Sequence, residues 1–272
     1  MILSTNLPGI SLAISPAIFP NIYIAIQGIP GSYSEQAARS YFSKFLNLKI
    51  NFIYTQSFQD LVQALDPDSF SEKQRKSDKN IKKKSGEKLI FGVIPIENST
   101  TGFVKPAQEV LNKNIKKLKL LDQIILPIQH ALLAHPSVNH ISEIKWARSH
   151  PQALAQCANF LKSKQIQAQE FFDTAGAAEA LSQATLLDRD GVAAIASKIC
   201  ADIYDLKILE ENIQDLKNNQ TRFLIIRPFK TNPEPDLKKI KKIKKIKKDS
   251  EILNLSQKSI LNSAGLINTR VF

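Results

Sequence analysis

The chain has 272 residues, 43% of them apolar, and a formal net charge of +12. This length and apolar content exclude a disordered protein and suffice for one large domain or two small ones. A positive charge of this size is typical of nucleic-acid-binding proteins, but most of the excess lies in two segments, 71–88 and 229–249. Because the rest of the chain is nearly neutral, the sequence predicts no nucleic-acid partner for the folded part.

The N-terminal residues and the cysteines bear on the compartment. The first basic residue is Arg39, so the first 20 residues lack the charged region of a secretory signal and the Arg-rich face of a transit peptide. No segment reaches the roughly 18 uninterrupted apolar residues that span a bilayer. Cys157 and Cys200 lie in Ala-rich helical patterns and are expected to be buried thiols of a reducing compartment. We therefore expect a cytoplasmic protein without a membrane partner and with a flexible extension over 1–20.

From residue 21 onward, short apolar runs alternate with amphipathic segments. The apolar runs predict strands at 22–27, 51–54, 89–96, 122–135, 143–149, 167–172, 191–196 and 222–227. The amphipathic segments predict helices at 33–46, 58–66, 106–114, 150–163, 173–184 and 197–206. This alternation is typical of an α/β fold with largely parallel sheets, and its length favours two small lobes. Segment 66–88 has almost no apolar residues and is expected to be a disordered basic insertion.

Four strand-to-helix junctions carry small polar residues and glycines. They read GIPGSYS at 28–34, ENSTTG at 97–102, SHPQ at 149–152 and DTAG at 173–176. Ser, Thr, Asp and Asn are preferred helix N-caps, so capping alone accounts for any single junction. Ligands of open α/β sheets gather at this end of the strands, where helix N-termini offer free N–H groups to an anion. If the junctions converge, they can bind a small carboxylate without a basic patch.

Other kinds of site lack their sequence patterns. The chain has no P-loop, no GxGxxG and no GxSxG elbow. His130, His135 and His140 are five residues apart, a spacing that suits metal ligands neither on a helix nor on a strand. The sequence therefore predicts neither a metal nor a cofactor.

Five segments together resemble the motifs of prephenate dehydratase and its plant-type relative arogenate dehydratase. They are GIPGSYSEQAA, GVIPIENSTTGFV, SHPQALAQC, DTAGAAEAL and the run AAIASKICADIYDLKILEENIQDLKNNQTRFLII. The resemblance covers about residues 22–228 in the family's order. It implies a catalytic domain over 21–228 with the fold of type II periplasmic binding proteins, and an active site in the cleft between two lobes. Lobe 1 is expected at about 21–100 plus 200–228, and lobe 2 at about 101–199.

The same resemblance implies a reaction and its residues. The reaction is decarboxylative dehydration of prephenate to phenylpyruvate, or of arogenate to phenylalanine, with no metal or cofactor. Thr221 of the TRF signature is the implied catalytic hydroxyl, which assists departure of the ring hydroxyl. Because a threonine hydroxyl is a very weak acid, we expect it to donate a hydrogen bond and not a proton. The residues implied to line the cleft are Asn98, Ser99, Ser149, Gln156 and Thr174.

Several neighbouring residues have two expected roles each. A proton could come from water, from His150, or from Glu97 if burial raises its pKa; otherwise His150 and Glu97 orient their junctions. Arg222 either binds a substrate carboxylate or forms an ion pair with Glu35 or Asp215. The apolar side chains of Phe223 and Ala175 would favour loss of the leaving carboxylate as a neutral gas.

The chain also departs from the family pattern. Residues 229–272 are too few for an ACT regulatory domain and lack its ESRP motif, so we expect a Lys-rich tail, no ACT domain and no phenylalanine inhibition through one. Asp173 stands where many bacterial members have serine, which suggests that its carboxylate favours the amino group of arogenate unless it only caps the helix. The family resemblance also suggests a homodimer or homotetramer.

Two rival functions remain open at this point. The same fold serves non-catalytic binding modules, which would bind a small carboxylate without turnover. The lysine segments 71–88 and 229–249 could bind nucleic acid, with an affinity that collapses as salt rises.

Overall fold

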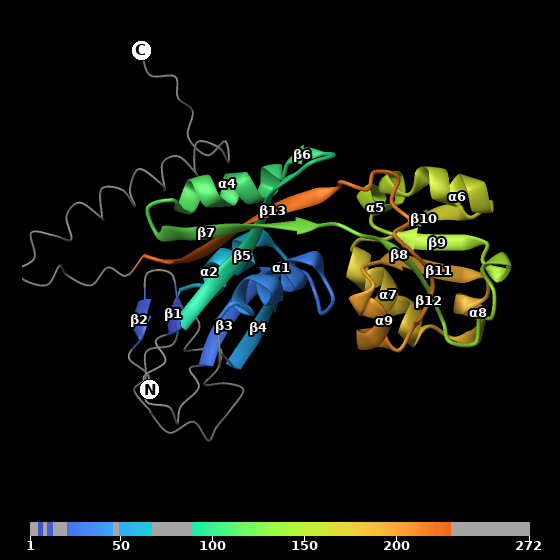
Figure 1. The fold of residues 1–272 in the computed structure, drawn as a ribbon, viewed down its shortest axis with the longest axis horizontal. Coiled ribbons are helices and arrows are strands. Elements are labelled where there is room, and N and C mark those ends of the chain that lie inside the picture. Colours follow the sequence, from blue (N-terminus) through green and yellow to red (C-terminus); the bar gives the residue numbers. More distant parts are fainter. Residues whose placement is uncertain (1–4, 8–9, 13–20, 46–48, 67–88, 230–272) are drawn as a thin grey trace, which may run out of the picture.

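The computed structural model describes residues 5–7, 10–12, 21–45, 49–66 and 89–229. They form two α/β lobes joined by two extended segments (Figure 1). This arrangement confirms the two-lobed α/β fold that the resemblance implied. Most of the insertion 66–88 and of the tail 229–272 lies outside the described residues, so the expectations about both stay predictions. In the described part of the chain, no helix is long and apolar enough to cross a membrane.

The first lobe is built on a sheet with the strand order β4-β3-β5-β13-β7, and β6 pairs with β5. Its strands are β3 (Asn21–Gln27), β4 (Lys49–Thr55), β5 (Leu89–Asn98), β6 (Gly102–Phe103), β7 (Leu118–Pro127) and β13 (Gln220–Pro228). Its helices are α1 (Tyr33–Phe42), α2 (Phe58–Ala64) and α4 (Lys105–Asn114). Successive strand residues point to opposite faces. Phe223 and Ile225 therefore pack with α1, whereas Leu224 and Ile226 pack with α2 and α4.

The second lobe is built on a sheet with the strand order β10-β9-β11-β8-β12. Its strands are β8 (Ala131–Ala134), β9 (Trp146–Ser149), β10 (Gln167–Glu170), β11 (Val192–Ala196) and β12 (Lys207–Glu211). Its helices are α5 (Pro151–Gln156), α6 (Ala158–Lys164), α7 (Thr174–Gln183), α8 (Leu186–Arg189) and α9 (Ile199–Tyr204), with a 3₁₀ turn at Ile141–Glu143. Side chains of α5 and α6 pack in one core cluster, and those of α7 and α9 pack in another.

Both cysteines are buried free thiols, as the sequence predicted. Burial raises the pKa of Cys157 to about 12 and that of Cys200 to about 11, so neither is a reactive thiolate at neutral pH. Cys157 also interrupts the helix predicted over 150–163, because it lies between the end of α5 at Gln156 and the start of α6 at Ala158.

The chain crosses between the lobes twice, and this corrects three expectations. The run 122–135, predicted as one strand, divides into β7 in lobe 1 and β8 in lobe 2. The strands of the second sheet are β8 to β12. Lobe 2 was expected at 101–199, but its sheet starts at Ala131 and ends at Glu211. β13 returns from lobe 2, so it is antiparallel to β5 and β7; β8 enters from lobe 1, so it is antiparallel to β11 and β12. The sheets are therefore mixed and not largely parallel.

Short elements outside the two sheets were not predicted. Within the expected extension 1–20, β1 (Thr5–Leu7) pairs antiparallel with β2 (Ile10–Leu12).

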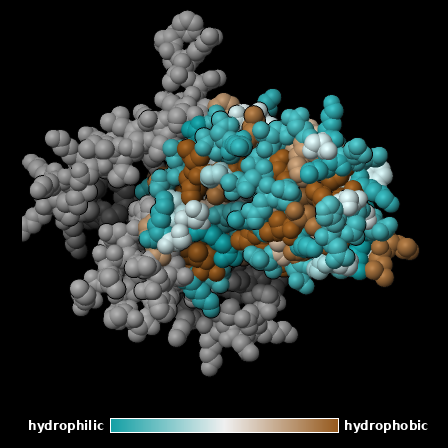
Figure 2. All heavy atoms as spheres, turned by 45° about the vertical axis from the view of Figure 1, so that its right-hand side comes forward, coloured by the Kyte–Doolittle hydropathy of each residue, from teal (hydrophilic) through white to brown (hydrophobic). Residues whose placement is uncertain are grey.

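The surface view shows hydrophobic side chains gathered among hydrophilic ones on the face in view (Figure 2). Phe172 and Leu187 are 76% and 91% exposed. Exposed apolar residues are normal on a protein surface, so the homodimer or homotetramer stays a prediction.

Candidate active site

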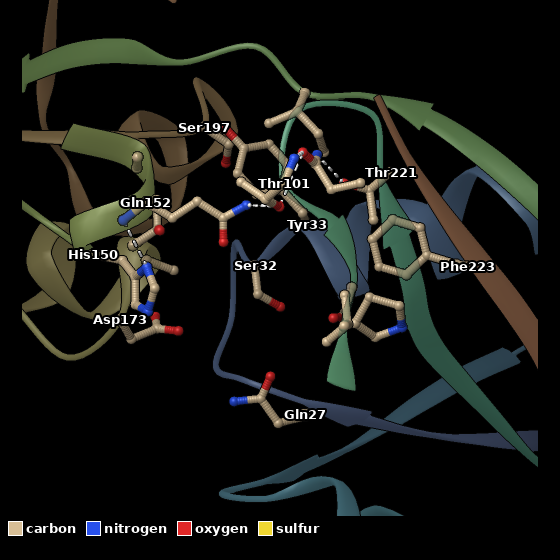
Figure 3. A pocket seen from close by; sticks show the side chains of 18 of the residues that line it. Gln27, Ser32, Tyr33, Thr101, His150, Gln152, Asp173, Ser197, Thr221 and Phe223 are labelled. Carbon is tan, nitrogen blue, oxygen red and sulfur yellow. Dashed lines mark hydrogen bonds between the residues drawn. The ribbon is translucent and has the colours of Figure 1, made fainter. Parts of the chain in front are cut away.

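A cavity of about 680 Å³ lies between the two lobes. Figure 3 shows Thr221 and Phe223 on one wall, and His150 and Asp173 on the opposite wall. Each of the four predicted junctions contributes to the lining, with Gly31, Ser32, Tyr33, Ser34, Asn98, Thr101, His150, Gln152, Asp173, Thr174 and Ala175. The expected convergence of the junctions is therefore present.

The junction residues also cap their helices. The Ser32 side chain accepts from the main-chain N–H of Glu35, and Asp173 Oδ1 accepts from that of Gly176 at 2.7 Å. His150 Nδ1 accepts from the main-chain N–H of Gln152 at 3.2 Å. Capping and lining are thus two uses of the same side chains, since a cap residue stands where the helix meets the cavity.

Thr221 lies opposite Asn98 in the pairing of β13 with β5 and is 8% exposed. The Nδ2 atom of Asn98 donates to Thr221 Oγ1 at 2.9 Å. Because the amide is the donor in this bond, the hydrogen of the Thr221 hydroxyl is not used in it. Asn98 is the hydrogen-bond partner of this hydroxyl among the described residues, so the O–H group is free to donate into the cavity.

Asn98 is itself held in a ring of side-chain hydrogen bonds. Its Nδ2 donates to Asn219 Oδ1 at 2.8 Å, and Asn219 Nδ2 donates to Gln156 Oε1 at 3.0 Å. Gln156 Nε2 donates to Thr100 Oγ1 at 2.9 Å, and Thr100 Oγ1 donates to Asn98 Oδ1 at 2.6 Å. The ring joins α5 of lobe 2 to lobe 1 and to the segment before β13. Asn98 Oδ1 also accepts from the main-chain N–H of Thr100 at 3.0 Å, so the amide that orients Thr221 is held by lobe 1 itself and by the ring.

His130 lies between β7 and β8, lines the cavity and is 2% exposed. Its Nε2 lies 2.9 Å from Gln156 Oε1, and its Nδ1 lies 2.8 Å from the Tyr33 hydroxyl. An amide oxygen only accepts, so Nε2 carries the hydrogen. In the neutral ring Nδ1 is then an acceptor, and it shares the single hydrogen of the Tyr33 hydroxyl with the Gln129 carbonyl, also at 2.8 Å. Burial lowers the pKa of His130 below its ordinary value, so the ring is neutral at pH 7. Sequence reasoning considered this residue only as a metal ligand and missed its contact with Gln156.

The lowered pKa of His130 predicts a pH-dependent stability. Its contribution is complete above the unfolded pKa of about 6.5, and it is lost as the pH falls through the lower folded pKa, because the unfolded state binds the proton first. The free energy of unfolding of the wild type should therefore fall more steeply from pH 6.5 to 5 than that of His130→Gln, by up to about 1.4 kcal/mol per pH unit. Urea denaturation at a series of pH values checks this, and parallel curves would contradict it.

The GIPGS turn of lobe 1 touches lobe 2 directly. Gly31 has φ of +85°, and a Cβ there would lie 2.6 Å from Cys200 Sγ, so no larger residue fits. The Ser197 hydroxyl donates to the Gly31 carbonyl at 2.9 Å. On the other side, the Gly31 N–H donates to the buried carboxylate of Glu35 at 2.9 Å. Ser197 also lines the cavity, at a junction before α9 that the sequence analysis did not single out.

Arg222 and Glu97 are not part of the cavity lining. This corrects the expected roles of Arg222 in binding a substrate carboxylate and of Glu97 in supplying a proton. They are neighbours across β13 and β5 and form an ion pair with each other. Alternation along β13 turns Arg222 away from the side that the preceding threonine occupies. The expected partners are engaged elsewhere, since Glu35 pairs with Arg39 at 2.6 Å and Asp215 accepts from a main-chain N–H.

Two further predicted residues also lie outside the lining. Ser149 is completely buried and donates to the carbonyl of Ile195 at 2.6 Å. Ser99 Oγ accepts from the Gln220 N–H at 3.0 Å and so ties the start of β13 to the loop after β5. Both hydroxyls form hydrogen bonds with the main chain and hold elements that carry the site, without lining the cavity themselves. The other predicted residues do line the cavity: Asn98, His150, Gln156, Thr174, Thr221 and Phe223.

The prephenate dehydratase family model matches residues 24–231. The chain belongs to the prephenate dehydratase family. It is 36% identical over 221 residues to the chloroplastic arogenate dehydratase/prephenate dehydratase 1 of Arabidopsis thaliana, covering 78% of this chain and 49% of the relative. It is 33% identical over 196 residues to the prephenate dehydratase of Methanocaldococcus jannaschii, covering 72% and 61%. The chain thus spans 49% and 61% of the length of these two relatives.

The fold agrees with this membership. The crystal structure of an Arthrobacter aurescens prephenate dehydratase in complex with L-Phe superposes with a TM-score of 0.61 and 21% identity, covering 79% of this chain and 63% of that one. The resemblance inferred from the five motifs is therefore confirmed at the level of family and fold. The cytoplasmic location stays a prediction, and the Arabidopsis relative is named chloroplastic.

In this member of the family, the cavity has few charged groups. Among the described residues that line it, Lys105 is the cation and Asp173 is the carboxylate. His130 adds no charge at neutral pH. No group of three or more His, Cys, Asp or Glu in the described residues could hold a metal ion. The remaining polar side chains of the lining are hydroxyls, amides and the His150 ring, which suits a ligand recognised chiefly by hydrogen bonds.

Proposed function

We propose that this chain catalyses the decarboxylative dehydration of prephenate to phenylpyruvate in the cavity between its lobes. The observation that supports this most is the Thr221 hydroxyl, held by Asn98 with its hydrogen free, in a chain of the prephenate dehydratase family. In the reaction, the bond from the ring to its carboxylate breaks. The electron pair moves through the ring and expels the hydroxyl at the opposite ring carbon. With one proton taken up, the products are carbon dioxide, water and phenylpyruvate.

Thr221 assists departure of the hydroxyl by donating a hydrogen bond to it. Charge develops on that oxygen in the transition state, so a donor already in place stabilises the transition state more than the substrate. One preorganised donor of this kind is worth about 3 to 4 kcal/mol. The aromatic ring that forms supplies the thermodynamic drive, so the protein has chiefly to position the substrate and stabilise the leaving oxygen.

The apolar wall next to Thr221 serves the other half of the reaction. Phe223 is two residues further along β13 and lines the same cavity (Figure 3), together with Pro95, and Ala175 adds an apolar side chain from lobe 2. A carboxylate against such groups lacks the solvation that stabilises its charge, whereas carbon dioxide loses little there. The wall therefore favours loss of the carboxylate.

His150 and water are the proposed sources of the proton. The Nδ1 atom of His150 accepts from the Gln152 N–H, which leaves Nε2 as the donor towards the cavity. Glu97 is not a proposed proton source, because it forms an ion pair with Arg222 and does not line the cavity.

A second substrate, arogenate, is favoured by Asp173. One oxygen of this carboxylate accepts from the Gly176 N–H, and the residue lines the wall opposite Thr221. Its second oxygen could bind the ammonium group that distinguishes arogenate from prephenate. The alternative activity is thus an arogenate dehydratase that yields phenylalanine directly.

Turnover of the purified full chain on prephenate and on arogenate tests the proposal. We expect phenylpyruvate or phenylalanine as the product, identified by chromatography, and a smaller ratio of kcat/KM for arogenate over prephenate in Asp173→Ser than in the wild type. An unchanged ratio would contradict the role of Asp173. Binding of either substrate without product would favour a non-catalytic module of the same fold.

A further inference from the structure

Lys105 has no assigned role in the dehydration, yet it lines the cavity at the first residue of α4. It is exposed, whereas Thr221 and Phe223 at the reacting wall are 8% and 2% exposed. The cavity lining thus combines a buried hydroxyl at Thr221 with an exposed cation at Lys105. A substrate whose ring hydroxyl meets Thr221 has its ring carboxylate and its side chain on the opposite ring carbon, away from that hydroxyl.

No ion pair with another described residue neutralises the charge of Lys105. The described residues contain three ion pairs, which are Arg39 with Glu35, Lys198 with Glu211, and Arg222 with Glu97. Lys105 is in none of them, although Glu109 follows it by one helical turn. An ammonium group without a partner beside a cavity for an acidic ligand can bind a carboxylate at little cost, because no existing pair has to be broken.

The chemistry decides which carboxylate Lys105 can bind usefully. The ring carboxylate loses its charge in the reaction, so a cation held against it would stabilise the substrate more than the transition state and slow the reaction. The carboxylate at the end of the side chain keeps its charge throughout. A cation there binds substrate and transition state equally and lowers KM without changing kcat.

We propose that Lys105 anchors the side-chain carboxylate that the substrate retains, a role that rests on the proposed dehydratase function. The ammonium group fixes the side-chain end of the substrate while Asn98 and Thr221 act on the ring hydroxyl at the other end. The residue then determines the affinity of the site for substrates and products that carry this carboxylate.

Steady-state kinetics of Lys105→Met and Lys105→Arg on the better of the two substrates test this role. We expect KM to rise about tenfold in Lys105→Met, with kcat within about twofold of the wild type, and Lys105→Arg to recover most of the affinity. The inhibition constant of the reaction product separates the two carboxylates, because the product keeps the side-chain carboxylate and has lost the other. It should rise by the same factor as KM.

Lys113→Met, at an exposed position in the last turn of the same helix, is the matched control and should leave KM and the inhibition constant unchanged. A KM for Lys105→Met equal to that of the wild type overturns the proposal. So does a raised KM with an unchanged product inhibition constant, since Lys105 would then bind the leaving carboxylate. If the wild type turns over neither substrate, the dehydratase function has failed, and that outcome is seen before any variant is compared.

Discussion

Replacing Thr221 with alanine should lower kcat by about 100- to 1,000-fold, because it removes the hydrogen-bond donor that meets the departing hydroxyl. KM should change little, since the bond forms chiefly in the transition state. The fold should survive, because Asn98 Nδ2 retains Asn219 Oδ1 and the Gln220 carbonyl as acceptors. Steady-state kinetics and thermal unfolding of the purified variant measure both effects.

Two further variants separate the hydroxyl from the shape of the side chain. Thr221→Val keeps the volume and loses the hydroxyl, so it should be as slow as Thr221→Ala. Thr221→Ser keeps the hydroxyl and should retain at least about a tenth of the wild-type kcat. If the valine variant stayed within tenfold of the wild type, the hydroxyl would not be the group that assists the reaction.

Changing Asn98 to aspartate should lower kcat about 100-fold without altering the size of the side chain. A carboxylate only accepts, so the Thr221 hydroxyl would turn to donate to it and would no longer donate to the substrate. The same change sets a carboxylate oxygen against Asn219 Oδ1, where the wild type has a 2.8 Å hydrogen bond. The free energy of unfolding should therefore fall by about 1 to 3 kcal/mol.

Activity and stability must be measured together for this variant. Urea denaturation gives the folded fraction, and kcat is then referred to folded protein. Asn114→Asp, in the last turn of α4 and outside the cavity lining, is a control for the added charge and should keep the wild-type kcat. A folded Asn98→Asp protein with wild-type kcat would show that the direction of this hydrogen bond has no effect on the reaction.

The convergence of the four junctions could be predicted from sequence because it depends on local signals. Each junction is an apolar run followed by small polar residues, as in LIFGVIPI before ENSTTG. Within each lobe, strand ends meet at one edge of the sheet, so the polar residues after them come together. The family resemblance then implied that the two lobes face each other across a cleft. The family motifs then identified Thr221 and Asn98 within that set.

The crossings between the lobes could not be predicted in the same way. Pro127, Gln129 and His130 interrupt the apolar run 122–135, but they do not indicate that β7 pairs with β13 in one sheet while β8 pairs with β11 in the other. The choice of partner is made by packing between residues far apart in the chain. The mixed sheets and the position of β12 in lobe 2 follow from that choice.

The supporting residues of the site were missed for a similar reason. Thr100, His130 and Asn219 contact Gln156 across long stretches of sequence, and their residue types alone do not indicate such contacts. One signal was available, because Asn219 lies two residues before Thr221 in NQTRF. For Arg222, the alternation along β13 would have indicated a direction away from the threonine's side.

The double variant Asn98→Asp with Thr221→Ala tests most directly whether Asn98 acts through the Thr221 hydroxyl. Its kcat is compared with those of the two single variants on the preferred substrate. If the amide works by orienting the hydroxyl, nothing is left to orient once the hydroxyl is gone, and the double variant should be within about twofold of Thr221→Ala alone. If kcat of the double variant fell by the product of the two single-variant losses, this account would be contradicted. Asn98 would then have a separate part in the reaction.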